Sequence, residues 1–423
     1  MNDRDEKVRE IVARIECGIK EIQEKIVHVS TDAVVATAEE EIAELFGRVK
    51  EEVQQAVVHQ QVAERDANRE APRCCICGAK MKVHAHRKRT VYTRNGQLVI
   101  WRRYYLCRPC KEGESPLDAE LGLKGEFTAA VDELMCLADS LQSSRLSEMV
   151  VRKLAGLQIS HDAIHRHAVA AGKKFHLQQI TQAPVTKLPK GTKRAYVSAD
   201  GVMIRLQDSL FHEMKLGCFY NQGQGYRQYV ATTKDCDAFG EELRRMAHFS
   251  GMKQAKQVAI IGDGAPWLWE QARTRFPLAD REIVDFYHAA ERIAKAGTDM
   301  YGEGTTAAQR FLGEYRHRLR HEGGKAVLAR LKRSSRYRTG DDAMQLLAGY
   351  IQKNVNRMDY PALKEQGFDI GSGMIESGCK NLVQARLKGS GMRWSEDSAI
   401  AVANLRGMLL SGRWDEQWPT LVA

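Results

Sequence analysis

The stretch Val258-Ala-Ile-Ile-Gly-Asp-Gly-Ala-Pro-Trp267 joins a short apolar run to a glycine-flanked aspartate. The apolar run suits a β-strand that is buried on both faces, as in a parallel sheet. Upstream, residues 194–198 lead into Asp200-Gly201, and β-rich runs follow at 202–206, 214–220 and 228–232. A helix is predicted at 237–248, before the Val258 strand, and one more strand at 282–286.

Three antiparallel strands, a helix and then parallel strands predict an RNase H-like core, a mixed β-sheet with flanking helices, within a multidomain α+β and α/β chain. In such a core the first strand lies beside the first strand after the helix, so Asp200 and Asp263 would be neighbours. Facing carboxylates suit Mg²⁺, which prefers oxygen ligands. A third carboxylate is predicted at Glu376, in Gly371-Ser-Gly-Met-Ile-Glu-Ser-Gly-Cys-Lys380, whose glycines allow close approach to the sheet. The alternatives are Asp-Gly turns and a glutamate that merely favours a helix N-terminus.

Four of the ten cysteines form the pairs Cys74-x-x-Cys77 and Cys107-x-x-Cys110. Between them, Asn95-Gly96 separates two β-rich runs, 88–94 and 97–106, and favours a tight hairpin turn. A hairpin would bring the pairs together as the four ligands of a structural Zn²⁺. The alternatives are four buried thiols without a metal, and Cys75 as the ligand in place of Cys74.

The basic residues are concentrated in one segment. The chain has 64 Lys and Arg against 54 Asp and Glu, a net charge of +10. Residues 74–111 contain no acid, which predicts contact with double-stranded DNA because neutralised phosphates release counterions. The DNA-contacting candidates there are Arg87, Lys88, Arg89, Arg102 and Arg103. Further candidates near Glu376 are Lys380, Arg386, Lys388 and Arg393.

Two helical regions flank this segment. Val8, Val12, Ile15, Ile19, Ile22 and Ile26 form one apolar seam, and Ile42, Leu45, Val49, Val53 and Ala56 form a second. They predict a coiled-coil or hairpin dimerisation arm, or else amphipathic helices packed on their own domain. Further on, a helix at 147–155, a turn at Gly156 and a helix capped by Ser160 and ending at Gly172 resemble a helix-turn-helix. Its second helix would present His161, His165 and Arg166 to DNA, although most such helix pairs bind nothing.

Length and composition predict several domains and no membrane span. The charged N-terminus is unlike a secretory signal, so a cytoplasmic protein is expected. The predicted domains are a helical arm (1–70), a zinc ribbon (71–115), a helix-turn-helix region (116–180), the first part of the core (194–288), an all-helical basic insertion (289–370) and the C-terminal part of the core (371–423).

Five motifs together resemble a known family: Ser198-Ala-Asp-Gly201, Gly262-Asp-Gly-Ala-Pro-Trp267, Asp285-Phe-Tyr-His288, Gly373-Met-Ile-Glu-Ser-Gly-Cys379 and Met392-Arg-Trp-Ser395. They look like a bacterial DDE-type insertion-sequence transposase, closest to the Kra-four family and similar to Mutator-like transposases. The resemblance implies that Asp200, Asp263 and Glu376 form a catalytic triad holding two Mg²⁺ ions, which Mn²⁺ could replace. It also implies that Asp285 and His288 support catalysis, although a histidine that packs at the sheet edge is an alternative for His288.

The function expected from this resemblance is binding of terminal inverted repeats, followed by DNA strand cleavage and strand transfer. A homodimer or higher homo-oligomer on DNA is expected, in a bacterial cytoplasm and associated with the nucleoid. Two other functions remain open: an RNase H-like nuclease that cleaves without joining, and a domesticated DNA-binding regulator without catalysis.

Overall fold

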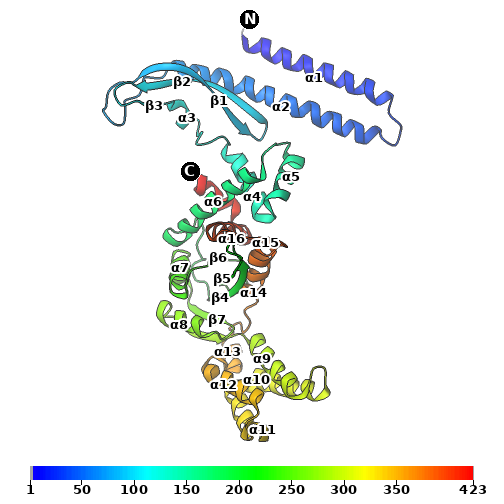
Figure 1. Cartoon of the computed structure of the whole chain (residues 1–423), viewed down its shortest axis with the longest axis vertical. Coiled ribbons are helices and arrows are strands. Elements are labelled where there is room, and N and C mark those ends of the chain that lie inside the picture. The colour runs from blue at the N-terminus through cyan, green and yellow to red at the C-terminus, as the bar shows by residue number, and fades with distance from the viewer. Residues whose placement is uncertain (1–2, 423) are drawn as a thin grey trace. The chain divides into compact units, whose positions relative to one another are not determined.

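The structure, a computed structural model, describes residues 3–422 and mixes helices with two β-sheets (Figure 1). The chain forms two compact units. Unit 1 holds Met1–Ala138 and Ser144–His165, and unit 2 holds Asp139–Ser143 and Arg166–Ala423. Within residues 3–422, no helix is long and apolar enough to cross a membrane. The finer domain boundaries expected from the sequence stay predictions.

Unit 1 begins with a hairpin of two long helices, α1 (Asp3–Val27) and α2 (Val34–Ala67). Ile22, Leu45 and Val49 are buried between them. The helices come close at Gly18, where a Cβ atom would lie 2.5 Å from a methyl group of Leu45. The apolar seams predicted from the sequence therefore supply the residues that join the two helices.

A three-stranded antiparallel ribbon packs beside α2, in the order β1 (Lys82–Thr93), β2 (Gly96–Cys107) and β3 (Glu112–Glu114). The turn between β1 and β2 is Arg94-Asn95, and Gly96 has the positive φ of 110° that glycine adopts without strain. Thr93 pairs with Gly96 and Lys82 with Leu106. The predicted hairpin is confirmed, with strands longer than the sequence pattern indicated.

Four helices follow the ribbon: α3 (Pro116–Glu120), α4 (Ala129–Leu141), α5 (Ser144–Ala155) and α6 (His161–Thr181). Gly156 turns the chain after α5 with a φ of 70°. The Ser160 hydroxyl accepts a hydrogen bond from the Ala163 N–H at 3.3 Å, so the predicted cap is confirmed. Val151, Leu157 and Ile164 belong to the small core that joins α5 to the start of α6.

The prediction that the second of these helices ends at Gly172 is wrong, because α6 continues to Thr181. A Cβ at Gly172 would lie 2.2 Å from the carbonyl oxygen of Ala401, in α16 (Glu396–Leu410). This glycine therefore permits a close contact between two helix backbones rather than ending a helix.

Unit 2 is built on a five-stranded sheet of β4 (Arg194–Arg205), β5 (Phe211–Asn221), β6 (Arg227–Thr232), β7 (Gln257–Gly262) and β8 (Arg281–Val284). The strand order is β6-β5-β4-β7-β8, in which β4, β5 and β6 are antiparallel and β4, β7 and β8 are parallel. Ser198 pairs with Ile261. The expected side-by-side placement of the first strand and the Val258 strand is confirmed, although residues 194–205 form one strand rather than two.

Helices follow and cover these strands: α7 (Cys236–Phe249), η1 (Met252–Gln254) and α8 (Pro266–Arg275). After β8 the chain is helical in α9 (Phe286–Tyr301), α10 (Thr306–Arg333), α11 (Ser335–Arg338), α12 (Asp342–Asn354), η2 (Val355–Arg357) and α13 (Tyr360–Glu365). The last segments are α14 (Gly373–Gly378), the π-helix η3 (Cys379–Gln384), α15 (Ala385–Leu387), α16 and α17 (Trp414–Val422).

Helix α16 protects the edge of the sheet through a single asparagine. The buried Asn404 amide accepts a hydrogen bond from the Ala231 N–H at 3.0 Å and donates one to the Ala231 carbonyl at 2.7 Å. Ala231 lies in the edge strand β6, where unpaired backbone groups would otherwise be open to another chain. Asn404 thus makes the two backbone hydrogen bonds that a further strand would make with Ala231.

The structure contradicts the expected DNA contact of Arg386. This side chain is 1% exposed, and its Nε and Nη2 atoms donate to the carbonyl and carboxylate of Asp139 at 2.7 and 3.2 Å. Its guanidinium also lies over the Trp394 ring. A side chain enclosed in this way cannot reach a phosphate, and its role is to pair with a buried carboxylate.

We expect Arg386→Met to lower the free energy of unfolding by about 3–5 kcal/mol, because the methionine fills similar volume but leaves Asp139 as a buried charge. Urea unfolding followed by circular dichroism measures the effect. Lys388→Met, at an exposed position two residues away, is the matched control and should change stability by less than about 0.5 kcal/mol. Equal unfolding midpoints for the two variants would contradict the structural role of this ion pair.

Candidate active site and metal cluster

Two of the predicted acids lie at the same end of the parallel strands. Asp200 is in β4 and Asp263 directly follows β7, two residues beyond the Ser198–Ile261 pair on each strand. The Asp200 carboxylate accepts a hydrogen bond from the Gly201 N–H at 2.7 Å, and that of Asp263 accepts one from the Ala265 N–H at 2.9 Å. Both aspartates are half-buried. The sheet pairing itself thus makes them neighbours.

The third acid, Glu376, comes from helix α14, which packs closely on the sheet. A Cβ at Gly378 would lie 2.9 Å from Leu216 and 3.0 Å from the Tyr229 ring, on β5 and β6. The expectation that glycines allow this close approach is confirmed. Glu376 lies 3.6 Å from Nε2 of His288, and the side chains of both are about one-third exposed. His288 also contacts Glu291 at 3.4 Å.

Asp285 is fully buried and connects the segments that carry His288 and Glu376. One carboxylate oxygen accepts hydrogen bonds from the N–H groups of Tyr287 at 2.5 Å and His288 at 3.0 Å, which caps α9. The other oxygen accepts from the Ser372 hydroxyl at 2.5 Å and from the Ser372 N–H. Asp285 therefore positions these segments and is itself closed to solvent.

The carboxylates influence one another electrostatically. Burial raises the pKa of Asp200, the Gly201 hydrogen bond opposes this shift, and the negative charge of Asp263 raises the pKa further. The Cys379 thiol donates to the Asp200 carboxylate at 3.6 Å. This hydrogen bond and the interaction with His288 both lower the pKa of Asp200. Burial, followed by the charge of Asp200, raises the pKa of Cys379 itself. Burial and the neighbouring charge of Asp263 therefore disfavour the ionised form of Asp200.

Sequence reasoning missed the roles of Cys379 and Ser372. Both lie inside the quoted glycine-rich motif, but nothing in the motif shows which side chains face the sheet. Cys379 begins the π-helix η3, and a π-helical turn shifts the register of the side chains that follow it. Such turns are frequent at functional sites, yet the amino-acid sequence alone gives no signal for them.

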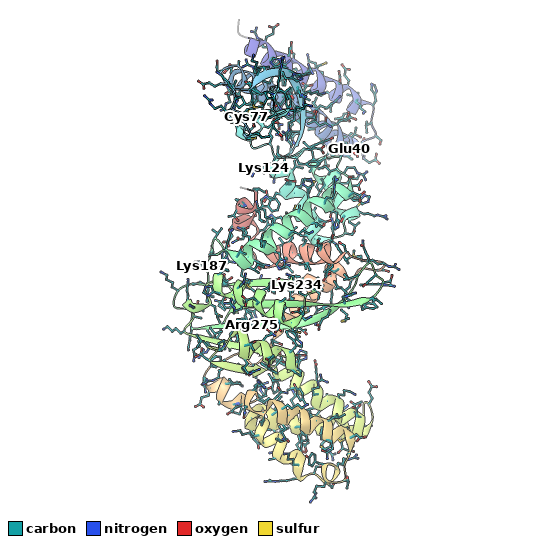
Figure 2. The ribbon with its side chains drawn as sticks, turned by 60° about the vertical axis from the view of Figure 1, so that its left-hand side comes forward. Glu40, Cys77, Lys124, Lys187, Lys234 and Arg275 are labelled. Atoms are coloured by element: carbon teal, nitrogen blue, oxygen red, sulfur yellow. The ribbon has the colours of Figure 1, made fainter. Side chains whose placement is uncertain are left out.

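The four predicted cysteine ligands form a compact cluster at one end of the ribbon. Among residues 3–422, they are the one group of His, Cys, Asp and Glu side chains placed closely enough to hold a metal ion. Their sulfur atoms all lie within 4.8 Å of one another, and those of Cys77 and Cys107 are 3.6 Å apart. Cys77 is labelled in Figure 2. Cys75 is exposed and outside the group, so Cys74 is the member from this pair.

Local backbone geometry favours the metal-binding form of Cys74. Hydrogen bonds from the N–H groups of Cys77 and Ile76 lower the pKa of Cys74 to about 7. Gly78 supplies the positive φ of 70° that turns the chain, and its N–H donates to the Cys74 carbonyl at 2.9 Å. A thiol that ionises near neutral pH is ready to bind a metal, since the thiolate is the ligand.

By contrast, Asp200, Asp263 and Glu376 do not converge on a single point in the described structure. They come from three elements, with Asp263 close enough to Asp200 for its charge to raise the pKa of Asp200. Their carboxylates are the donor type that a hard divalent cation prefers, although the spacing is wider than that of a closed metal site.

The predicted DNA-contacting residues differ in accessibility. Arg89 and Arg102 both pair with Asp118 of α3, at 2.5 and 2.7 Å, and His161 contacts Glu148 at 2.8 Å. These pairs occupy the side chains within unit 1 and make them less available to a phosphate. Arg103 and His165 are half-buried. The exposed candidates are Arg87, Lys88, Arg166, Lys380, Lys388 and Arg393.

Beside Asp263 lies a large hollow of about 1120 Å³, between α8 and helix α12 of the segment that follows β8. The Tyr350 hydroxyl donates to the Asp263 carbonyl at 3.2 Å and fixes α12 next to this acid. The basic residues that line the hollow are Arg273, Arg292, Lys353 and Arg357. Arg357 pairs with Glu282 at 2.5 Å and covers the Trp269 ring. The acidic residues of the lining are Asp263, Glu270, Glu282 and Asp342, so the hollow is open, carries both signs of charge and adjoins one acid of the site.

The chain belongs to the uncharacterised protein family UPF0236, whose model matches residues 30–417. That match covers both units, including the cysteine cluster, the three acids and the helices between β8 and α14. No curated protein matches the chain.

The raised pKa of Asp200 predicts an unusual effect of Asp200→Asn. An acid whose pKa is raised on folding destabilises the ionised protein above that pKa, and the effect disappears below the ordinary aspartate value near 4. We therefore expect Asp200→Asn, without added divalent cations, to be more stable than the wild type at pH 7 and equal to it near pH 4. Urea unfolding at the two pH values measures this difference.

Asp208→Asn is the matched control with the opposite sign. The N–H of Leu210 and then His212 lower the pKa of Asp208, so its ionised form contributes stability that is lost as the pH falls. This variant should be less stable than the wild type at pH 7. If Asp200→Asn also lost stability at pH 7, electrostatic crowding at the site would be excluded.

Proposed function

We propose that the chain is a DDE-type DNA transposase that cleaves and rejoins DNA with Mg²⁺. The observation that carries the proposal is that Asp200 and Asp263 lie at the same end of two adjacent parallel strands, with Glu376 on helix α14, which packs on the same sheet. The strand order of the sheet supports an RNase H-like core, in which the three antiparallel strands precede the first helix. The helices from α9 to α13 correspond to the proposed insertion (Figure 1). Membership of UPF0236 is compatible with the proposed likeness to Kra-four transposases.

The residues fit a divalent cation by donor chemistry. Burial, and then the negative charge of Asp263, raises the pKa of Asp200, so a divalent cation bound by both carboxylates would offset the unfavourable charge. Asp200, Asp263 and Glu376 would hold Mg²⁺, or Mn²⁺ in its place. When bound, the metal supplies activation of water or of a 3′-hydroxyl for in-line attack on a phosphodiester.

The chain's own residues would orient this reaction. Asp285 holds α9 and the loop before α14 in place, so that His288 and Glu376 remain 3.6 Å apart. In the first step a water oxygen bonds to phosphorus and the bond to the 3′ oxygen breaks, leaving a 3′-hydroxyl. In the second step that hydroxyl attacks a target phosphodiester, and the target's 3′ oxygen leaves with the proton.

Double-stranded DNA is the proposed partner, both as element ends and as target. The exposed cations Arg87 and Lys88 on the ribbon, Arg166 on α6, and Lys380, Lys388 and Arg393 near α14 would bind phosphates. The hollow beside Asp263 would supply further room for a strand, with Arg292 and Lys353 as cations among the mixed charges of its lining. The proposed location is a bacterial cytoplasm, where DNA is accessible.

The cysteine cluster is proposed to bind a structural Zn²⁺. Four sulfur atoms at 2.3 Å from a tetrahedral zinc lie about 3.8 Å apart, and the Cys77–Cys107 separation of 3.6 Å agrees with this spacing. Four cysteines leave no open position for catalysis. The metal would fix the ends of β1 and β2 that lie farthest from the Arg94-Asn95 turn.

Purified protein should contain one zinc per chain, and Cys107→Ser should lose it together with much of the ribbon's thermal stability. Mass spectrometry of the metal content measures the first effect, and thermal unfolding the second. Cys75→Ser is the matched control, because Cys75 lies outside the cluster, and it should retain the metal. Zinc retained by Cys107→Ser at the wild-type level would contradict the assignment.

Strand cleavage is tested on a labelled duplex that carries the sequence flanking the gene, with Mg²⁺ or Mn²⁺. We expect Asp263→Asn and Glu376→Gln each to reduce cleavage at least about 100-fold while DNA binding is retained. Asp299→Asn and Glu365→Gln, at exposed helix positions, are the matched controls. Cleavage with joined products supports the transposase, and nicking that never yields joined products supports a nuclease. DNA binding by the wild type without cleavage in either metal would indicate a regulator and reject the catalytic proposal.

A further inference from the structure

The helical hairpin of unit 1 leaves one face apolar and exposed. Three residues of α1, Val8, Val12 and Ile19, are 43–52% exposed, and four of α2, namely Ile42, Phe46, Val53 and Val57, are 41–64% exposed. In each helix these residues follow spacings of four and seven, which place them along one stripe. A separate set, which includes Ile22, Leu45 and Val49, is buried between the helices. The exposed stripes are therefore additional to the contact that holds the hairpin together.

Both stripes lie on the same face of the hairpin. Gly18 contacts Leu45, and Arg14 pairs with Glu52 at 2.5 Å, which fixes how the antiparallel helices align. This alignment places Val12 beside Val53, and likewise Val8 beside Val57 and Ile19 beside Phe46. The ion pairs Arg14–Glu52 and Lys25–Glu41 project from the opposite side of the hairpin. One side is thus charged and the other apolar.

The ribbon does not cover this apolar face. It contacts α2 through a different side, where Gln55 exchanges hydrogen bonds with Val99 and Val62 packs on Leu98 and Ile100. The whole hairpin face is about 37 Å long, from the helical rise over 25 residues, and about 20 Å wide for two helices. The exposed apolar residues occupy about 23 Å of this length, from the helical rise between Ile42 and Val57. The area of the whole face is then roughly 750 Å², close to the 800 Å² per partner of a stable protein interface.

The charge of the hairpin excludes DNA as its partner. Helix α1 has seven acidic and six basic residues, a net charge of −1, and α2 has eight acidic and three basic residues, a net charge of −5. Phosphates would be repelled from this arm, whereas they are attracted to the ribbon. A large exposed apolar face is typical of a protein interaction site, and its partner should be another apolar protein surface.

We propose that the occupant of this face is the same face of a second copy, which gives a four-helix bundle with two-fold symmetry. An isologous contact needs one self-complementary patch, and paired apolar stripes provide it. The two-fold axis runs along the hairpin, so that α1 of each copy lies on α2 of the other. This arrangement keeps the two strongly acidic α2 helices apart, and it makes every neighbouring pair of helices antiparallel. The dimer does not depend on catalysis or on DNA.

The full-length chain without DNA is examined by sedimentation equilibrium. We expect a mass of twice 47.7 kDa for the wild type and the monomer mass for the double variant Val12→Glu with Val53→Glu, whose dimer dissociation constant should rise at least 100-fold. Leu278→Glu, at a position 90% exposed in unit 2, is the matched control and should stay dimeric. Circular dichroism checks that helix content is unchanged. A monomeric wild type, or a double variant that remains dimeric, overturns the proposal.

Cross-linking tests the arrangement without disrupting the hairpin. In a Cys17→Ser, Cys75→Ser background, which removes both exposed thiols outside the cysteine cluster, a Val12→Cys chain is mixed with a Val53→Cys chain and treated with a short bismaleimide. We expect cross-linked heterodimers in the mixture, and at least tenfold less cross-linking when either chain is treated alone. Equal cross-linking of the separate chains would place α1 on α1 and overturn the proposed axis. Because neither experiment uses DNA or metal, failure here leaves the transposase proposal untouched, and the reverse also holds.

Discussion

The buried carboxylate of Asp285 is the constraint on which the candidate active site depends. Its hydrogen bonds join the end of β8, the first turn of α9 and the loop that leads to α14. Residues 286–371 lie between the two segments that Asp285 connects. Its hydrogen bonds therefore hold together the two ends of this long helical segment. A charge at zero exposure is costly unless several N–H and O–H groups surround it, and Asp285 has four.

The helical excursion is attached to the sheet at further points that all lie near the acids. The Tyr360 hydroxyl donates to the Val284 carbonyl at 2.9 Å, and Tyr350 donates to the Asp263 carbonyl. These contacts fix α12 and α13 beside the strand ends and create the hollow next to Asp263. The helices between the second and third acids therefore also form one wall of the hollow beside Asp263.

Much of this organisation could be predicted because it depends on local sequence. The spacing of the cysteines and the Asn95-Gly96 turn indicated the cluster, and short apolar runs indicated the strands. Other features depend on contacts between distant residues. The local sequence predicts a helix end at Gly172, but this glycine faces the backbone of Ala401. The local sequence likewise predicts an exposed cation at Arg386, but this side chain pairs with buried Asp139. Local patterns carry no information on such partners.

The sequence by itself indicated most of the helices and strands, the four cysteines that cluster and the three candidate acids, because these follow from residue type and spacing. The tertiary structure decided which of them meet: the β4–β7 register aligned Asp200 with Asp263, and the packing of α14 on β5 brought Glu376 to His288. It also decided which cations remain exposed and which face of the arm stays open. The physical reason is that burial and charge pairing are properties of neighbours in space, and neighbours in space are separated here by up to hundreds of residues along the chain.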